Sequence, residues 1–172
     1  IIGISFAVAA FPTLSKTWAN GQKKEFFENF SLTFRQIIFL IIPVSFLIFI
    51  LRAQIVRLVL GTLGKEFDWV ATRLTAASLG IFSISILASA LIPFLHRAFF
   101  SFQNTKIPTF IALATVLLNI ILSSSLVKIL RFSNSFQIFL INLLKLKGIE
   151  EISVIGLPLA FTIAAIFQFL LL

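Results

Sequence analysis

The sequence reads LTAASLGIFSISILASALIPFL from Leu74 to Leu95 and IPTFIALATVLLNIILSSSLV from Ile107 to Val127, with HRAFFSFQNTK (His96 to Lys106) between them. Neither long stretch contains a charged residue, and each has at least 21 residues. An α-helix rises 1.5 Å per residue, so about 20 residues cross a hydrocarbon core of roughly 30 Å. The two stretches therefore predict a hairpin of two membrane-spanning helices.

The composition of the whole chain also favours a membrane protein. Hydrophobic residues make up 59% of the 172 residues, charged residues make up 12%, and the mean hydropathy is +1.11. This leaves too little polar surface to cover a water-soluble globule. We therefore expect an all-α fold, a polytopic bundle of transmembrane helices with the bilayer as its solvent.

Apolar runs and the polar breaks between them predict five membrane segments in a single transmembrane domain. The spans are expected at about residues 1–15, 32–51, 74–95, 107–127 and 152–172. The first reads as the exit half of a helix that begins upstream. A polar loop is expected at Lys16–Glu28, with its turn at Asn20 and Gly21. Pro43 removes a backbone hydrogen bond from the second span, and we expect it to bend that helix by more than about 20°.

The segment at about residues 133–145 differs from the spans in length and pattern. Its apolar residues recur at helical spacing, at Phe136, Phe139, Leu140, Leu143 and Leu144. A helix of this length is too short to cross the bilayer. We therefore predict a helix that lies in the membrane interface.

Composition and motifs also exclude several classes of function. The net charge of +8 comes from basic residues that stand singly or in pairs between apolar runs, so we do not expect a nucleic-acid partner. The chain has no cysteine and one histidine, which rules out a Cys-based metal site and a histidine cluster. All six carboxylates fall in predicted loops, and no catalytic or phosphate-loop motif occurs. We therefore predict neither an enzyme nor a bound cofactor.

Five short segments carry a resemblance to a known family. They are Phe11-Pro12-Thr13-Leu14-Ser15, Ile42-Pro43, Arg57-Leu58-Val59-Leu60-Gly61, Arg97-Ala98-Phe99-Phe100 and Asn104-Thr105-Lys106-Ile107-Pro108. Together they resemble the C-terminal lobe of the MurJ (MviN) family, within the MATE-like superfamily of multidrug and polysaccharide-lipid exporters. The most specific piece is the strip from Arg97 to Pro108. Family members have about fourteen spans, of which this chain resembles about spans eight to twelve.

The resemblance implies a function and a set of partners. The family flips lipid II, the lipid-linked peptidoglycan precursor, across the bacterial cytoplasmic membrane, and two lobes are expected to rock about a central cavity. The partners would then be membrane lipids, lipid II and the remaining lobe of the same chain. The arginines that hold the pyrophosphate in this family belong to segments outside this chain. The family topology also places the Lys16–Glu28 and His96–Lys106 loops in the cytoplasm, whereas the count of Lys and Arg leans the other way.

Two arginines are candidates for a role in gating or substrate contact. Arg97 and Arg35 each stand near the end of a predicted span. Each could extend to lipid headgroups, as arginines at span ends commonly do, or form a gate or lobe contact at the cytoplasmic mouth. We expect His96, beside Arg97, to be structural.

Three polar residues are expected inside the membrane, at Asn119, Ser123 and Thr162. A mid-membrane amide is costly unless it is paired, so Asn119 should face protein or a wet cavity. Some family members resemble cation binders in this lobe, with an Asn and an Asp one turn apart and a threonine on the next span. Here Ser123 stands where that Asp would be, so we favour hydrogen bonding between helices over a cation site. Coupling to a monovalent cation stays open.

Other functions remain as alternatives at this point. The chain could belong to a polysaccharide-lipid or multidrug exporter of the same superfamily, or to a membrane scaffold that transports nothing. The sequence upstream of Ile1 would discriminate among them. Arginines clustered in its first spans would favour lipid II, and acidic residues there would favour a cation-coupled drug exporter.

Overall fold

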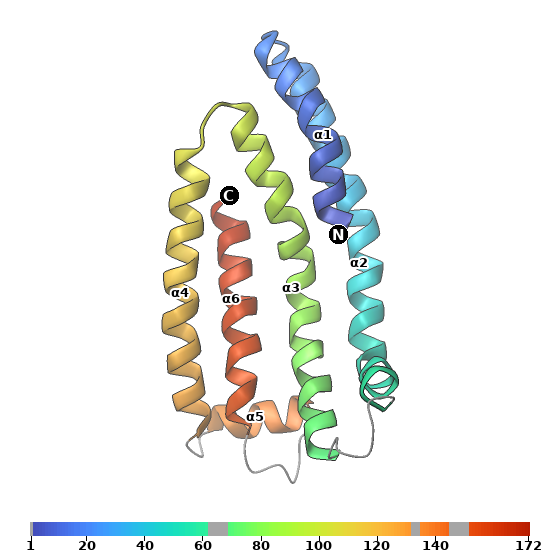
Figure 1. Cartoon of the computed structure of the whole chain (residues 1–172), viewed down its shortest axis with the longest axis vertical. Coiled ribbons are helices and arrows are strands. Elements are labelled where there is room, and N and C mark those ends of the chain that lie inside the picture. The colour runs from blue at the N-terminus through green and yellow to red at the C-terminus, as the bar shows by residue number, and fades with distance from the viewer. Residues whose placement is uncertain (1, 62–68, 132–134, 145–151) are drawn as a thin grey trace. The chain divides into compact units, whose positions relative to one another are not determined.

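The computed structural model describes residues 2–61, 69–131, 135–144 and 152–172, and these residues form helices and short turns without a strand (Figure 1). The helices are α1 (Ile2–Ala19), α2 (Lys23–Gly61), α3 (Trp69–Ser101), α4 (Lys106–Arg131), α5 (Ser135–Leu144) and α6 (Gly156–Leu171), with a 3-10 turn at Ser153–Ile155. The predicted all-α class is therefore confirmed.

Four helices of the described part are long and apolar enough to cross a membrane. They cover Lys23–Val59, Trp69–Ser101, Lys106–Arg131 and Ser153–Leu171. The two hairpin helices α3 and α4 have 33 and 26 residues, which exceeds the length needed to span the hydrocarbon. The chain is thus a polytopic helical membrane protein.

The helices extend further into polar sequence than the apolar runs predicted. The predicted loop at Lys16–Glu28 is mostly helical, because only residues 20–22 separate α1 from α2. Likewise, only residues 102–105 separate α3 from α4 within the predicted His96–Lys106 loop, and Gly61 is the last residue of α2. Helical hydrogen bonds satisfy the backbone beyond the apolar run, so polar side chains do not end a helix.

The turn after α1 was located correctly, because Gly21 adopts a positive φ of 72°. The Gly21 N–H donates to the Trp18 carbonyl at 3.0 Å, and the Gln22 N–H donates to the Thr17 carbonyl at 3.0 Å. This pair of bonds is the Schellman arrangement that ends many helices, in which glycine avoids the strain of a left-handed backbone.

The turn after α3 has the same arrangement with a different residue. Gln103 occupies the left-handed position with a φ of 59°. Its N–H donates to the Phe100 carbonyl at 2.9 Å, and the Asn104 N–H donates to the Phe99 carbonyl at 3.2 Å. A non-glycine residue therefore carries backbone strain at this turn.

The contacts of the chain divide it into two compact units, which we describe separately. Unit 1 comprises Ile1–Ser45, Ile86–Val116 and Ala165–Leu172, and unit 2 comprises Phe46–Ser85 and Leu117–Ala164. Helices α2, α3, α4 and α6 contribute residues to both units.

The core of unit 1 is rich in aromatic rings. Its buried residues are Ala7, Leu14, Phe26, Ile37, Ile41, Leu91 and Phe94. Phe26 contacts the rings of Trp18 and Phe102 at centroid distances of 5.4 and 5.0 Å. Phe30, one turn along α2, stacks on Phe94 at 5.0 Å. Rings spaced four residues apart on α2 therefore bind that helix to α1 and α3.

The core of unit 2 is aliphatic. Its buried residues are Ala77, Ile81, Leu130, Leu140, Ile152 and Ile155. A β-carbon built on Gly156 of α6 would lie 2.9 Å from the Val127 nitrogen and 3.0 Å from the Leu126 carbonyl carbon of α4. The absence of a side chain at Gly156 therefore lets the α4 and α6 backbones approach closely.

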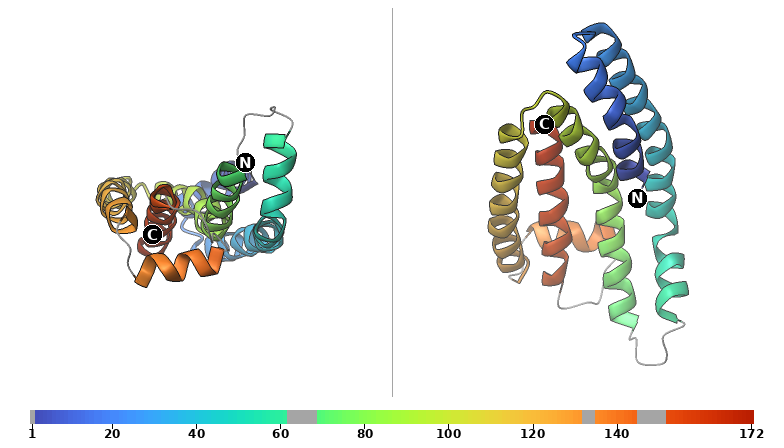
Figure 2. Two further views of the ribbon diagram at one scale, coloured as in Figure 1. Left: turned by 90° about the horizontal axis from the view of Figure 1, so that it is seen from below. Right: turned by 45° about the horizontal axis from the view of Figure 1, so that its top comes forward.

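Helix α5 belongs to unit 2 and lies across α4 and α6 rather than along them (Figures 1 and 2). Leu140 is buried, with Ile141 and Leu144 packed against the same core. Phe139 and Leu143, which the sequence placed on the same stripe, are instead more than half exposed. Apolar side chains thus cover two faces of α5, so periodicity could not decide which one packs.

Some predictions for these segments fall outside what the structure describes. Residues 133, 134 and 145 and the side chain of Phe136 lie outside the described residues. The position of α5 in the membrane interface stays a prediction. Pro43 stands inside α2 with an exposed side chain, and the bend expected there stays a prediction.

Candidate functional site

The structure brings two of the motif segments together in unit 1. The Arg97 guanidinium carbon of α3 lies 5.7 Å from the ring centroid of Phe11 on α1. Arg97 is half-buried, so this cation–π contact is partly shielded from solvent. In the same α1 segment Pro12 is exposed and Ser15 is half-buried. Arg97 therefore has a protein partner on α1, and neither of the sequence hypotheses for this residue named Phe11 as that partner.

Neighbouring residues of the Arg97 strip contact other elements of unit 1. The His96 Nε2 atom lies 3.4 Å from Nε2 of Gln168 on α6. Ala98 is buried, and the Ser101 hydroxyl donates to its carbonyl oxygen at 2.6 Å. Phe102 then contacts Trp18 of α1 at a centroid distance of 4.4 Å. The strip from His96 to Phe102 is thus joined to α1 and α6 at both of its ends.

The last motif segment shapes the start of α4. The Ile107 N–H donates to Asn104 Oδ1 at 3.4 Å, and the Thr109 N–H donates to the Thr105 carbonyl at 3.3 Å. Pro108 is the third residue of α4 and is fully buried. Proline is tolerated there because the first turn of a helix does not need its N–H. Asn104, Thr105 and Pro108 therefore have structural roles at a helix start.

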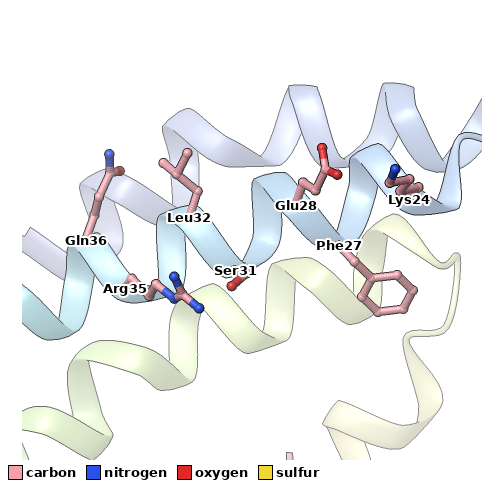
Figure 3. A pocket seen from close by; sticks show the side chains of 7 residues that line it. All are labelled: Lys24, Phe27, Glu28, Ser31, Leu32, Arg35 and Gln36. Atoms are coloured by element: carbon pink, nitrogen blue, oxygen red, sulfur yellow. The ribbon is translucent and has the colours of Figure 1, made fainter.

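Arg35 stands in different surroundings from Arg97. It is exposed and borders an open groove of about 700 Å³ in unit 1 (Figure 3). The other lining residues are Lys24, Phe27, Glu28, Ser31, Leu32 and Gln36, so all seven come from α2. A groove formed along one helix resembles a lipid-facing surface more than an enclosed binding cavity. The choice between a headgroup contact and a gate for Arg35 stays a prediction.

The polar residues expected inside the membrane find partners in unit 2. The Ser123 hydroxyl donates to Asn119 Oδ1 at 3.1 Å within α4. A serine one turn away on the same helix therefore supplies a partner for the Asn119 amide oxygen, and a bond from Asn119 to another helix stays a prediction. Such a bond does occur at Thr162 of α6, whose buried hydroxyl donates to the Ile81 carbonyl of α3 at 3.3 Å.

Ser123 and Thr162, which were considered for a cation site, both take part in hydrogen bonds within the protein. Ser123 donates to an amide on its own helix, while Thr162 donates to a backbone carbonyl. Among the residues that the structure describes, no group of three or more His, Cys, Asp or Glu side chains could hold a metal ion. Coupling to a monovalent cation stays a prediction.

Comparison with known proteins identifies the family. The sequence profile described as "Lipid II flippase MurJ" matches residues 1–172, the whole chain. The chain belongs to this family. The motif segments that meet in unit 1 are therefore segments of a MurJ family protein.

Two curated relatives show the same similarity. A probable lipid II flippase MurJ of Bdellovibrio bacteriovorus is 31% identical over 128 residues, which cover 74% of this chain and 24% of the relative. A probable lipid II flippase MurJ of Buchnera aphidicola is 28% identical over 127 residues, with the same two shares. The chain thus spans about a quarter of the length of these relatives. No solved structure matches the chain.

Membership of the MurJ family and the four apolar helices together indicate where the protein resides. They support a multi-pass protein of the bacterial cytoplasmic membrane. The family consists of transporters, in agreement with the prediction that the chain is not an enzyme.

Proposed function

We propose that the chain is part of a lipid II flippase, which moves the lipid-linked peptidoglycan precursor across the cytoplasmic membrane by alternating access. The observation that carries this proposal is the family match over the whole chain. Because the chain spans about a quarter of its relatives, the cavity that encloses the pyrophosphate requires the rest of the protein. Lipid II and the remaining lobe are therefore proposed partners.

Within this function we propose that Arg97 is a positioning residue. Alternating access needs helices of one lobe to move together as a body. The contact between Arg97 and Phe11 joins α3 to α1, beside the aromatic contact between Phe102 and Trp18. We also propose that the turns at residues 20–22 and 102–105 face the cytoplasm, as the family topology implies.

The proposal is tested by complementation with the complete protein. That protein should restore growth when the host flippase is depleted, and it should move lipid II across reconstituted vesicles. The 172-residue chain alone should not, because it lacks the first lobe. If the complete protein inserts into the membrane but neither complements nor moves lipid II, another exporter of the superfamily becomes the better assignment.

Variants of the Arg97 contact test the positioning role. Arg97→Ala should weaken complementation without loss of membrane insertion, and Arg97→Lys should be milder because the positive charge remains. Phe11→Leu should resemble Arg97→Ala, since it keeps an apolar side chain and removes the ring. Lys24→Ala is the control, because Lys24 is an exposed cation of the same unit. Full complementation by Arg97→Ala would show that this residue only anchors to headgroups.

A further inference from the structure

Helix α5 differs from the spans of unit 2 in its direction and in its position. It lies across α4 and α6 (Figure 1), and seen from below it lies beside the ends of these helices rather than beneath them (Figure 2). Both α4 and α6 belong to segments that are long and apolar enough to cross the membrane. A helix that crosses the ends of two spans runs along the membrane plane, and one that lies beside them turns a side away from the bundle.

Charges on α4 mark the level at which α5 lies. Lys128 and Arg131 stand in the last turn of α4, and both are exposed. Basic side chains at the end of a span extend toward the lipid headgroups. Leu130 of the same turn is buried in one core with Leu140 of α5. Helix α5 therefore lies near the level where headgroups meet acyl chains.

One side of α5 is packed against the core of unit 2. Leu140 is buried there, and Ile141 and Leu144 are packed against the same cluster. The other buried members of the cluster come from α3, from α4 and from the residues just before α6, and they are Ala77, Ile81, Leu130, Ile152 and Ile155. Helix α5 therefore connects three spans near one surface of the membrane.

The opposite side of α5 is apolar and exposed. Ile138 is 55% exposed, Phe139 is 59% exposed and Leu143 is 61% exposed. Phe139 and Leu143 stand one turn apart, so their side chains are neighbours on the helix surface. No charged residue occurs in Ser135–Leu144. Contact with water is unfavourable for such a surface, whereas acyl chains cover it at no cost.

We propose that Ile138, Phe139 and Leu143 insert into the acyl chains of one leaflet and anchor unit 2 to the membrane surface. The neighbouring span α4 also exposes large apolar side chains, at Ile120 and Ile121, which favours lipid over water beside α5. Asn142 is exposed on the same side of α5 and fits the interface, where water and headgroups satisfy its amide. The anchor does not depend on transport of lipid II, so it can be tested separately.

Spin labels on the complete protein in nanodiscs of phosphatidylethanolamine and phosphatidylglycerol test the anchor. The 172 residues contain no cysteine, so Phe139→Cys and Leu143→Cys each place one label in this chain, after any cysteine elsewhere in the protein is replaced by serine. Both labels should collide often with oxygen, which concentrates in lipid, and rarely with a water-soluble nickel complex. Gln22→Cys, in the exposed turn after α1, is the control that should report water.

The depth of the labels tests the direction of α5. Both should lie about 5 to 10 Å below the lipid phosphates, as expected for a helix in the interface. Their depths should be equal, because a helix along the membrane normal would separate these two positions by about 6 Å. Phe139→Asp should bring the label at Leu143→Cys severalfold closer to the nickel accessibility of the control, since a carboxylate resists insertion into acyl chains. Phe139→Leu keeps the surface apolar and should leave the label unchanged.

Four results would overturn the proposal. Nickel accessibility equal to that of Gln22→Cys at both labels would assign the surface of α5 to water. Few collisions with either reagent would show that another segment of the protein covers it. Unequal depths would show that α5 does not lie along the membrane plane, and an unchanged label in Phe139→Asp would show that the surface is not inserted. If one of the cysteine variants does not fold, Ile138→Cys replaces it, because Ile138 stands on the same side of α5.

Discussion

Unit 1 and unit 2 are packed by different means. Aromatic rings of α1, α2 and α3 fill the core of unit 1, with Phe26 and Phe94 fully buried. Unit 2 has an aliphatic core, a close approach of α4 and α6 at Gly156, and a hydrogen bond from Thr162 to α3. In lipid there is no hydrophobic force between helices, so shape and hydrogen bonding must hold them together. The two units satisfy that requirement with different residues.

Unit 1 also contains a close backbone contact at a glycine. A β-carbon on Gly3 of α1 would overlap the carbonyl oxygen of Ala90 on α3 in unit 1. Unit 1 therefore also uses a glycine, at the point where α1 meets α3. Rings and close backbone approach operate together in unit 1, whereas the described core of unit 2 contains no ring.

The largest expected effect is the loss of a central ring in unit 1. Phe26→Ala should lower the free energy of unfolding of the complete protein in detergent by about 3 to 5 kcal/mol, because it leaves a cavity beside four other rings. Phe27→Ala is the matched control, since Phe27 is 58% exposed and Phe26 is 1% exposed. Equal losses in the two variants would contradict the view that rings hold unit 1 together.

The glycine contacts should give the next largest effects. Gly3→Ala and Gly156→Ala should each destabilise by about 1 to 3 kcal/mol, because the added carbon forces two backbones apart. The loss should be greater for Gly3, whose β-carbon would overlap Ala90 itself. Thermal unfolding of the two variants in detergent measures both losses of stability. A larger loss at Gly156 would show that unit 2 depends more strongly on close approach.

The two similar turns of unit 1 allow a stabilising change. Gln103→Gly should raise the free energy of unfolding by up to about 1 kcal/mol, because glycine removes the strain of a left-handed backbone. Gly21→Gln makes the opposite exchange at the other turn and should destabilise by a similar amount. Unfolding midpoints measured on the two variants should therefore move in opposite directions, and shifts of the same sign would refute the strain argument.

The smallest expected effect concerns the buried hydroxyl of Thr162 in unit 2. Thr162→Val removes the bond to the Ile81 carbonyl and should cost about 0.6 kcal/mol, a typical value for such bonds in membranes. Thr115→Val makes the same chemical change on α4, where the hydroxyl donates to its own helix at the Ile111 carbonyl. The same unfolding measurement should show less change for Thr115→Val. A larger loss of stability in Thr115→Val than in Thr162→Val would show that the bond between helices contributes no more than a bond within one helix.

The sequence predicted the membrane helices because their signal is local. A run of about 20 apolar residues must be helical in lipid whatever it packs against, so the hairpin of α3 and α4 was predictable. The ends of the helices could not be predicted in this way, because polar residues such as Lys16 and Arg97 continue the helical hydrogen-bond ladder. The contacts of Phe26 and Phe30, which stand four residues apart on α2, were not predicted, because spacing does not indicate which helix a ring meets.

The candidate site was predictable only in part. The resemblance found the segments of Phe11 and Arg97, but their contact depends on the packing of α1 on α3. The sequence named no partner for Asn119, and the structure shows that Ser123, one turn away on the same helix, donates to its amide oxygen. The packing of the Arg52 side chain against Gly80 of α3 gave no signal in the sequence beyond a lone glycine in an apolar run. Contacts between distant residues are decided by packing, which composition and spacing do not encode.

The two tryptophans of the chain provide native spectroscopic probes, one in each unit. The Lys23 Nζ atom lies 6.0 Å from the centroid of the Trp18 ring, and the Arg57 guanidinium carbon lies 5.7 Å from the centroid of the Trp69 ring. A nearby cation changes the electric field at an indole and so shifts its emission. Movement of Arg57 away from the Trp69 ring should therefore shift the fluorescence of Trp69 while that of Trp18 stays constant. The chain thus carries an optical probe in unit 2 and an internal reference in unit 1.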